Sequence, residues 1–147
     1  MKTFFKEIIS YHHQINQKLI IQLAAHEHEL TDRTIPLLSH TINAQQIWNA
    51  RITGKEQLGV HEVHALKNCI TLDQENYQEA LRILNARDLK EKISYQNSKG
   101  IEFTNTIQEI FYHVANHFSH HKGQIISDLR QLGVTPILTD YIYYKRQ

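Results

Sequence analysis

Two histidines near the C-terminal end of the chain, His117 and His121, combine a residue type and a spacing that suit metal binding. They lie among apolar residues that recur at the three-and-four spacing of an amphipathic helix: Ile107, Ile110, Phe111, Val114, Phe118, Ile125, Leu129 and Leu132. Two residues four apart on a helix lie one above the other on nearly the same face. The pair therefore forms half of a metal site, and a third ligand has to come from another part of the chain.

A candidate for that third ligand lies in the second amphipathic segment. Its expected core stripe consists of Leu37, His40, Ala44, Ile47, Trp48 and Arg51. A histidine thus occupies a position where an aliphatic residue is expected, and we predict that His40, His117 and His121 bind one divalent metal ion. Three neutral imidazoles leave a coordination position open, which is typical of catalytic sites. Nitrogen ligands suit Zn, Ni, Cu or Fe, with Mn as a further candidate, and ligand type does not select among these ions.

The first two helices are predicted from apolar periodicity and from residues that begin or end helices. One helix should cover residues 4 to about 25, where no Gly or Pro interrupts the pattern. The second should begin with Thr34 as its N-cap, because a threonine oxygen can accept a backbone N–H, and Pro36 is tolerated in the first turn. Thr53 and Gly54 should end it.

Two further helices are expected in the second half of the chain. The inner face of the third consists of Leu66, Cys69, Ile70, Asp73, Tyr77, Ala80, Leu81 and Leu84. The fourth should begin at a capping box, in which Thr106 and Glu109 each bond the other's backbone N–H. Gly133 and Pro136 should end it. The fourth helix would carry His117 and His121, whereas His40 lies on the second.

A short β-hairpin is predicted between the third and fourth helices. Residues 93–95 and 101–103 alternate apolar and polar side chains on either side of the turn-forming residues 97–100. The fold class is therefore all-α, a four-helix bundle with one hairpin, and we expect residues 1–147 to form a single domain. Sites in such bundles lie between facing helices, as the proposed ligands require.

Composition excludes several classes of function. The 147 residues include 16 basic and 15 acidic ones, and the scattered basic residues argue against a nucleic-acid binder. A single cysteine, Cys69, excludes an internal disulfide and is typical of a reducing compartment. No apolar run reaches the length of a membrane span, and the charged N-terminus does not resemble a signal peptide. We therefore expect a cytoplasmic protein with no membrane partner.

Several segments together resemble the DinB/YfiT-like family. They are residues 37–48 (LLSHTINAQQIW), residues 116–125 (NHFSHHKGQI), residues 133–136 (GVTP) and the pair Asp140-Tyr141. The resemblance covers essentially the whole chain and implies an up-down-down-up four-helix bundle that forms homodimers. It also implies three histidine ligands for a divalent metal, which correspond to His40, His117 and His121. Lys122 stands where the family usually has arginine, so that the charge is kept but the planar guanidinium is lost.

The resemblance implies two kinds of function. One is a metal-dependent enzyme, a thiol S-transferase or hydrolase, that activates a low-molecular-weight thiol or water to attack an electrophilic small molecule. The other is a non-catalytic, stress- or damage-induced metal-binding homodimer. Cys69 lies at an apolar position of the third helix, so a thiol nucleophile would have to be a cosubstrate. A general base would have to come from Asp73, Glu109 or Asp128, and because no motif supports any of them the catalytic residues stay unassigned.

The other histidines carry weaker expectations. His113, one turn before His117, either orients that ligand or only lies on the helix face. His120 should face outward, because adjacent helical residues are rotated by about 100°. His12 is expected in the core rather than in a pocket. His61 and His64 should be surface or capping residues.

Three residues beside the ligands also carry expectations. Asn43 and Asn116 either hydrogen-bond a ligand or are ordinary polar helix residues. Gly123 lies in mid-helix, where glycine costs about 1 kcal/mol relative to alanine. It therefore predicts a close approach of another helix at that point.

Overall fold

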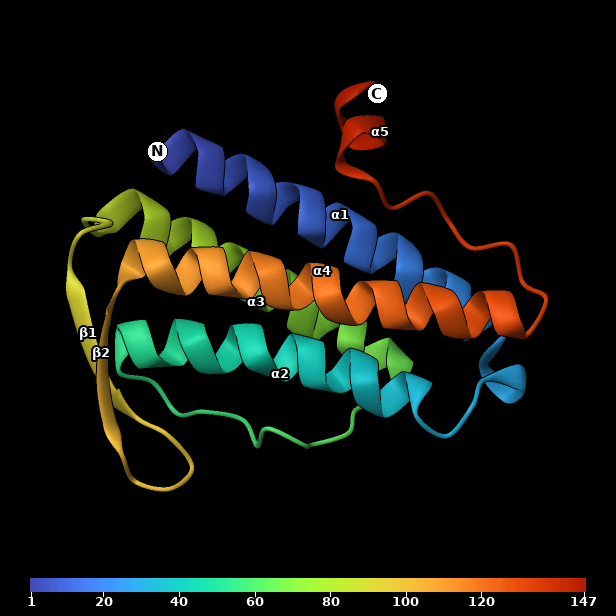
Figure 1. Ribbon diagram of the computed structural model, residues 1–147, viewed down its shortest axis with the longest axis horizontal. Coiled ribbons are helices and arrows are strands. Elements are labelled where there is room, and N and C mark those ends of the chain that lie inside the picture. Colours follow the sequence, from blue (N-terminus) through green and yellow to red (C-terminus); the bar gives the residue numbers. More distant parts are fainter.

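The computed structural model describes residues 1–147 and consists mainly of helices (Figure 1). The long helices are α1 (Lys2–Ala25), α2 (Thr34–Thr53), α3 (Leu66–Ala86) and α4 (Ile107–Gln131). A 3-10 helix, η1 (Glu27–Glu29), follows α1, the strands β1 (Lys92–Gln96) and β2 (Glu102–Thr106) precede α4, and a short helix, α5 (Tyr141–Lys145), lies near the C-terminus. The predicted all-α bundle with a hairpin between its third and fourth helices is confirmed.

The direction of the helices follows the expected up-down-down-up order. In Figure 1, α2 and α3 run in the same direction, and α1 and α4 run in the opposite one. Because α3 runs parallel to α2, residues 54–65 must return along the length of α2 before α3 can begin (Figure 1). This long connection therefore lies beside the helix that carries His40.

A polar layer divides the apolar core of the bundle. Along α1 the apolar cluster containing Phe5 and Ile9 is followed by buried His12 and Asn16, and then by a second cluster containing Leu19. The other long helices show the same order, with buried polar residues between their two apolar parts. The candidate ligands of α4 occur at the level of this layer, so they are placed among polar groups rather than in the apolar core.

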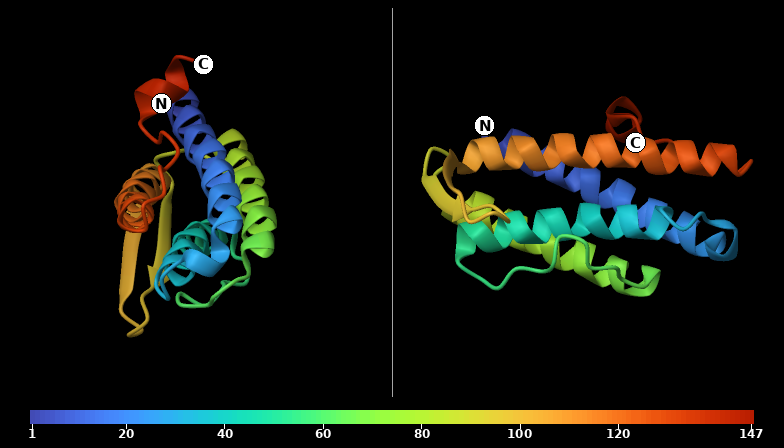
Figure 2. Two further views of the ribbon diagram at one scale, coloured as in Figure 1. Left: turned by 90° about the vertical axis from the view of Figure 1, so that its right-hand side faces the viewer. Right: turned by 60° about the horizontal axis from the view of Figure 1, so that its bottom comes forward.

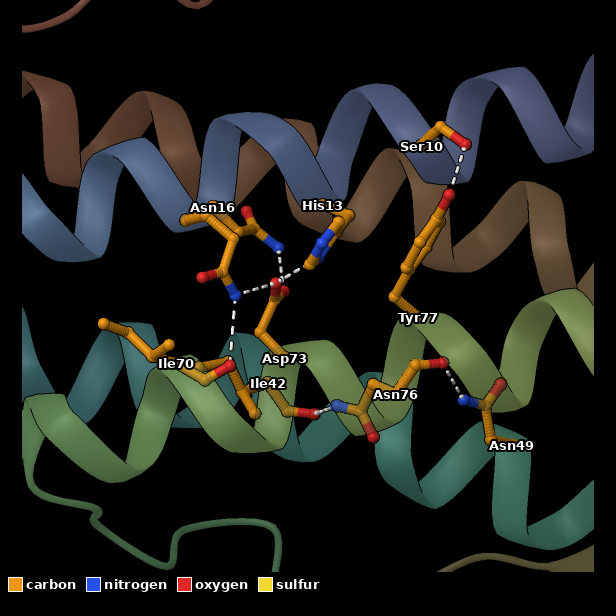
Figure 3. A network of polar contacts seen from close by, with 10 residues as sticks. Ser10, His13, Asn16, Ile42, Asn49, Ile70, Asp73, Asn76 and Tyr77 are labelled. Atoms are coloured by element: carbon orange, nitrogen blue, oxygen red, sulfur yellow. Dashed lines mark hydrogen bonds and ion pairs between the residues drawn. The ribbon is translucent and has the colours of Figure 1, made fainter.

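An aspartate of α3 is the centre of one part of the polar layer (Figure 3). The carboxylate of Asp73 accepts hydrogen bonds from His13 Nδ1 at 2.6 Å, Asn16 Nδ2 at 2.8 Å and Gln17 Nε2 at 2.9 Å, all on α1. The ring of His13 also stacks on Tyr77, with centroids 4.2 Å apart. Since only 1% of Asp73 is exposed, these bonds replace the water that the buried carboxylate loses.

The single stripe predicted for α2 is wrong, because this helix buries two faces. Of the six predicted stripe residues only Ile47 is buried, and the others, which include His40 and Trp48, remain partly exposed. Other buried residues of α2 contact α3, where Asn49 Nδ2 donates to the Asn76 carbonyl oxygen at 3.0 Å (Figure 3). A helix between two neighbours buries polar residues whose partners the sequence does not reveal.

Gly54 ends α2 in a left-handed conformation, as predicted, whereas one of the two predicted N-caps is confirmed and the other is wrong. Thr106 caps α4, with Glu109 N donating to Thr106 Oγ1 at 3.2 Å and Thr106 N donating to Glu109 Oε2 at 2.8 Å. The N-cap of α2 is Arg33, and Thr34 is the first helical residue. The Thr34 hydroxyl instead donates to Asp128 at 3.2 Å, and Arg33 pairs with the same carboxylate at 2.7 Å. A contact with α4 thus replaces the local cap.

The hairpin lies at the end of the bundle where α2 ends and α4 begins (Figure 2). Its strands pair antiparallel, with Tyr95 opposite Phe103. The Tyr95 ring contacts Trp48 of α2 with centroids 4.9 Å apart, and the Arg51 guanidinium lies 4.5 Å from the Trp48 ring and 4.6 Å from the Tyr95 ring. This stack of cation and aromatic rings attaches the hairpin to α2.

The aromatic C-terminal segment packs against α1, as its composition suggests. The Tyr11 ring lies 5.3 Å from the Tyr141 ring and 5.5 Å from the Tyr144 ring. Tyr141 also donates a hydrogen bond to Glu7, which forms an ion pair with Lys145 at 2.8 Å. The short helix α5 is therefore held on the outer side of α1.

The close helix approach predicted at Gly123 is wrong. Gly123 is exposed, and a Cβ atom added to it would meet no neighbouring atom within 4 Å. Since glycine then only adds conformational entropy to the unfolded chain, we expect Gly123→Ala to raise the free energy of unfolding by about 0.5–1 kcal/mol. Urea denaturation measures the change. A loss of stability would show that the alanine methyl meets an obstacle that the structure does not contain.

Candidate metal centre

Three histidines from two helices converge on one point. His117 and His121 occupy successive turns of α4, with ring centroids 4.4 Å apart, and His40 of α2 lies 4.9 and 5.0 Å from their two rings. One ring nitrogen from each histidine lies within 4.8 Å of those of the other two. The structure thus brings the three predicted ligands together, at a place where each is only partly buried.

Hydrogen bonds orient two of the imidazoles. His40 Nδ1 donates to the Val60 carbonyl oxygen at 3.3 Å, and His121 Nδ1 donates to Gln124 Oε1 at 2.7 Å. Because the proton of each ring is then on Nδ1, the Nε2 lone pair is free to bind a metal. His40 Nε2 also lies 3.1 Å from His117 Nε2, so these nitrogens meet at the centre of the cluster.

The electrostatics of the cluster favour neutral imidazoles. Burial and the neighbouring histidines lower the pKa of His117 to about 3, and burial lowers the pKa of His121 as well. A neutral imidazole is the form that binds metals, whereas three adjacent imidazolium ions would repel one another. Oriented, neutral nitrogen donors that converge without an acidic residue among them fit a divalent ion that accepts nitrogen ligands.

The returning segment, residues 54–65, supplies a part of the site that the sequence did not reveal. Asn43 Nδ2 donates to the Glu62 carbonyl oxygen at 2.7 Å, and His64 Nε2 donates to Asn43 Oδ1 at 2.6 Å. Asn43 therefore does not bond a ligand, but holds the segment whose Val60 carbonyl orients His40. The sequence shows that Asn43 is a polar residue one turn after His40, but it does not show which group Asn43 binds. That partner depends on the path of residues 54–65.

The other histidines near the cluster have separate environments. His113 is exposed and forms no hydrogen bond to a ligand, and its ring lies 5.8 Å from that of His117. Burial and the nearby Arg51 lower the pKa of His113. His120 faces outward as predicted, and His61 is exposed with its ring 6.0 Å from that of His40. None of these side chains belongs to the cluster of His40, His117 and His121.

None of the three carboxylates considered as general bases lies at the cluster. Asp73 is bound by residues of α1 (Figure 3), Glu109 caps α4, and Asp128 pairs with Arg33. Each is held by a structural contact that the sequence pattern did not indicate. The cluster therefore has no carboxylate from these positions to accept a proton.

Lys122 follows the last candidate ligand but faces α1 instead of the cluster. Its amine donates to His12 Nδ1 at 2.9 Å and lies 5.1 Å from the centre of the Tyr11 ring. Burial lowers the pKa of Lys122 to about 7 and that of His12 to about 2. His12 is thus buried, as predicted, but it also lines a groove between α1 and α4, which was not expected. Neither side chain contacts the three clustered histidines.

The single cysteine is not at the site either. Cys69 is a buried free thiol on α3, and burial raises its pKa to about 11. Since the thiolate is the nucleophile in thiol chemistry, a buried thiol with a raised pKa is unreactive near neutral pH.

Comparison with known proteins defines the class to which this fold and site belong. The sequence model of the family described as "DinB family" matches residues 22–147, and the chain therefore belongs to the DinB family. "Protein DinB" of Bacillus subtilis (strain 168) is 34% identical over 91 residues, which cover 61% of this chain and 51% of that protein. The chain thus matches about half the length of this curated relative. In the present chain, no helix has both the length and the hydrophobicity that a membrane span requires.

Proposed function

We propose that this protein is a metal-dependent enzyme in which His40, His117 and His121 hold one divalent ion. The observation that carries the proposal is the convergence of three imidazole nitrogens from α2 and α4 within 4.8 Å of one another. The chemistry that such an ion supplies is Lewis acidity, which lowers the pKa of a thiol or a water and so favours its nucleophilic form. The reaction class is attack of that nucleophile on an electrophilic small molecule.

On this proposal, the substrates bind beside the histidine cluster. With Cys69 buried on α3, the thiol is a low-molecular-weight cosubstrate. Beside the cluster, the His113 ring contacts Trp48 with centroids 5.3 Å apart, and the Arg51 guanidinium lies over the same indole. These side chains extend the site along α2 and α4, and they offer aromatic and cationic contacts to a bound small molecule.

One observation favours a second function, a metal-binding protein without catalysis. The carboxylates that could accept a proton, Asp73, Glu109 and Asp128, all have structural partners away from the cluster. On this alternative the bound metal stabilises the fold or regulates a homodimer. Light scattering on the metal-loaded and metal-free protein measures the dimer.

Metal analysis of the protein purified without a histidine tag tests the site. We expect about one divalent ion per chain in the wild type after loading with Zn, Ni, Fe or Mn, since three nitrogens suffice for a site with open positions. His117→Ala is expected to lose stoichiometric binding and to keep its helical circular dichroism, because only two ligands remain and the residue is partly exposed.

Matched variants distinguish a defined site from adventitious binding by a histidine-rich protein. His120→Ala removes the adjacent, exposed histidine and is expected to keep the full metal content. Gln124→Ala removes the acceptor of His121 Nδ1 and should weaken metal affinity about tenfold or more. Equal metal content in His117→Ala and His120→Ala would remove His117 from the ligand set.

Catalysis requires a separate assay. The metal-loaded protein is incubated with the electrophile 1-chloro-2,4-dinitrobenzene and, in turn, with cysteine, glutathione and bacillithiol, and conjugation is followed by absorbance. A rate that depends on both metal and protein supports the enzyme. If every thiol reacts only at the uncatalysed rate while one metal per chain is bound, the non-catalytic alternative is correct.

A further inference from the structure

A second concave site lies between α1 and α4. It is a groove of about 250 Å³ whose walls are mainly aromatic and apolar, with Phe4, Ile8, Tyr11, Tyr112, Ala115 and Tyr141 among the lining residues. Ser119 of α4 also lines it and is two residues from both His117 and His121, a rotation of about 200° around the helix. The groove therefore opens on a different side of α4 from the histidine cluster.

The groove contains one buried polar side chain, that of His12. Only 2% of His12 is exposed, and His12 is among the lining residues, so its small exposed part faces the groove. Lys122 donates to Nδ1 of this ring at 2.9 Å, which places the proton of the neutral imidazole on Nε2. No group of the protein accepts a hydrogen bond from Nε2. An enclosed N–H donor thus lies beside an apolar space.

The charges around the groove favour an anionic ligand. Lys122, behind His12, is 5% exposed and has no carboxylate bonded to its amine. Two acidic residues lie near the outer rim of the groove. Glu7 is paired with Lys145 at 2.8 Å and with the hydroxyl of Tyr141, whereas burial and the charge of Asp140, just before α5, raise the pKa of Tyr11. Burial lowers the pKa of Lys122 and the charge of Asp73 partly opposes this, but Asp73 is bonded by three side chains of α1 and makes no ion pair with the amine. An incoming carboxylate on the groove side of His12 would accept from the free imidazole N–H and add a favourable charge near this amine.

We propose that this groove binds a small aromatic carboxylate, with its ring against Tyr11 and Tyr112 and a carboxylate oxygen accepting a hydrogen bond from His12 Nε2. The exposure of Tyr112, 64%, leaves its ring free to cover the ligand. The volume accommodates one or two fused rings, and the ligand's apolar surface gains from leaving water. The site is independent of the metal centre and does not rest on the proposed reaction.

Isothermal titration calorimetry with 2-naphthoate tests this site, and 2-naphthamide serves as the uncharged analogue. We expect 2-naphthoate to bind one per chain and at least about tenfold more tightly than 2-naphthamide, a difference of about 1.4 kcal/mol. Ala115→Trp fills the groove from its partly exposed side and should weaken 2-naphthoate binding at least about tenfold. Ala24→Trp, in the groove between α1 and α3, is the matched control and should leave the affinity unchanged.

Two further variants separate this site from the metal centre and test the donor. The triple variant His40→Ala, His117→Ala, His121→Ala should bind 2-naphthoate as the wild type does, and loss of binding would place the ligand at the histidine cluster and overturn the proposal. His12→Phe alone would leave Lys122 without its acceptor, so it is combined with Lys122→Met. This double variant should bind the acid and the amide equally. Unchanged binding in Ala115→Trp, or an unchanged preference for the acid in the double variant, would also overturn the proposal.

Discussion

Replacing Asp73 by alanine is expected to lower the free energy of unfolding by about 3–5 kcal/mol. The carboxylate is 1% exposed and accepts hydrogen bonds from His13, Asn16 and Gln17, so that one residue of α3 joins three side chains of α1 (Figure 3). Its removal leaves a cavity and several donors without acceptors. Each buried donor left unpaired costs about 1–3 kcal/mol, because water cannot replace the lost partner without opening the helix interface.

Denaturation with urea, followed by circular dichroism, measures this loss. Asp32→Ala is the matched control, because Asp32 is exposed in the loop before α2 and its replacement is expected to change stability by less than about 0.5 kcal/mol. Asp73 belongs to the α1–α3 network and not to the metal centre, so the folded fraction of Asp73→Ala should keep its metal. A change below about 1 kcal/mol would show that water or other side chains satisfy the three donors.

Replacing Lys122 by methionine is expected to stabilise the protein near neutral pH. The amine is 5% exposed, its only hydrogen-bond partner is the neutral His12, and its pKa falls to about 7 in the folded protein. Methionine removes the buried charge at a similar side-chain volume, which typically gains about 1–4 kcal/mol. The loss of the donor to His12 Nδ1 offsets part of this gain, at about 1–3 kcal/mol.

The pH dependence identifies the cause of that stabilisation. Between the folded pKa of about 7 and the ordinary value of 10.5, the unfolded chain holds a proton on Lys122 that the folded protein has released. The wild type therefore becomes more stable as the pH rises through this window, whereas Lys122→Met lacks this contribution. We expect the advantage of the variant to be largest at pH 7 and below, and to shrink or reverse toward pH 10.

Unfolding of both proteins in urea at pH 6.5 and pH 9.5 measures the change in their difference. Lys18→Met, on the exposed surface of α1, is the control and should differ from the wild type by less than about 0.5 kcal/mol at either pH. A difference between Lys122→Met and the wild type that stays constant with pH would show that the pKa of Lys122 is not lowered by folding and that the amine keeps its proton throughout this range.

Features whose cause lies within a few residues were predictable from the sequence. His117 and His121 are four apart on a helix, so helical geometry alone brings their rings together. The capping box of Thr106 and Glu109 joins residues three apart, and the hairpin depends on the alternation and turn of residues 93–103. His40 could not be chosen as the third ligand from local geometry, because it contacts His117 across 77 residues of sequence. That choice depended on the stripe predicted for the second helix, which is wrong, and on the family resemblance.

Features that depend on which helix faces which were decided only by the tertiary structure. Thr34 has the chemistry of an N-cap, but its hydroxyl binds Asp128 because α4 lies beside it. Asn43 lies near a ligand, yet it holds the segment that returns along α2. Gly123 faces open solvent, although a mid-helix glycine suggested a close neighbour. Hydrogen-bonding capacity and periodicity are local properties of the chain, whereas the partner of each polar group depends on packing between elements distant in sequence.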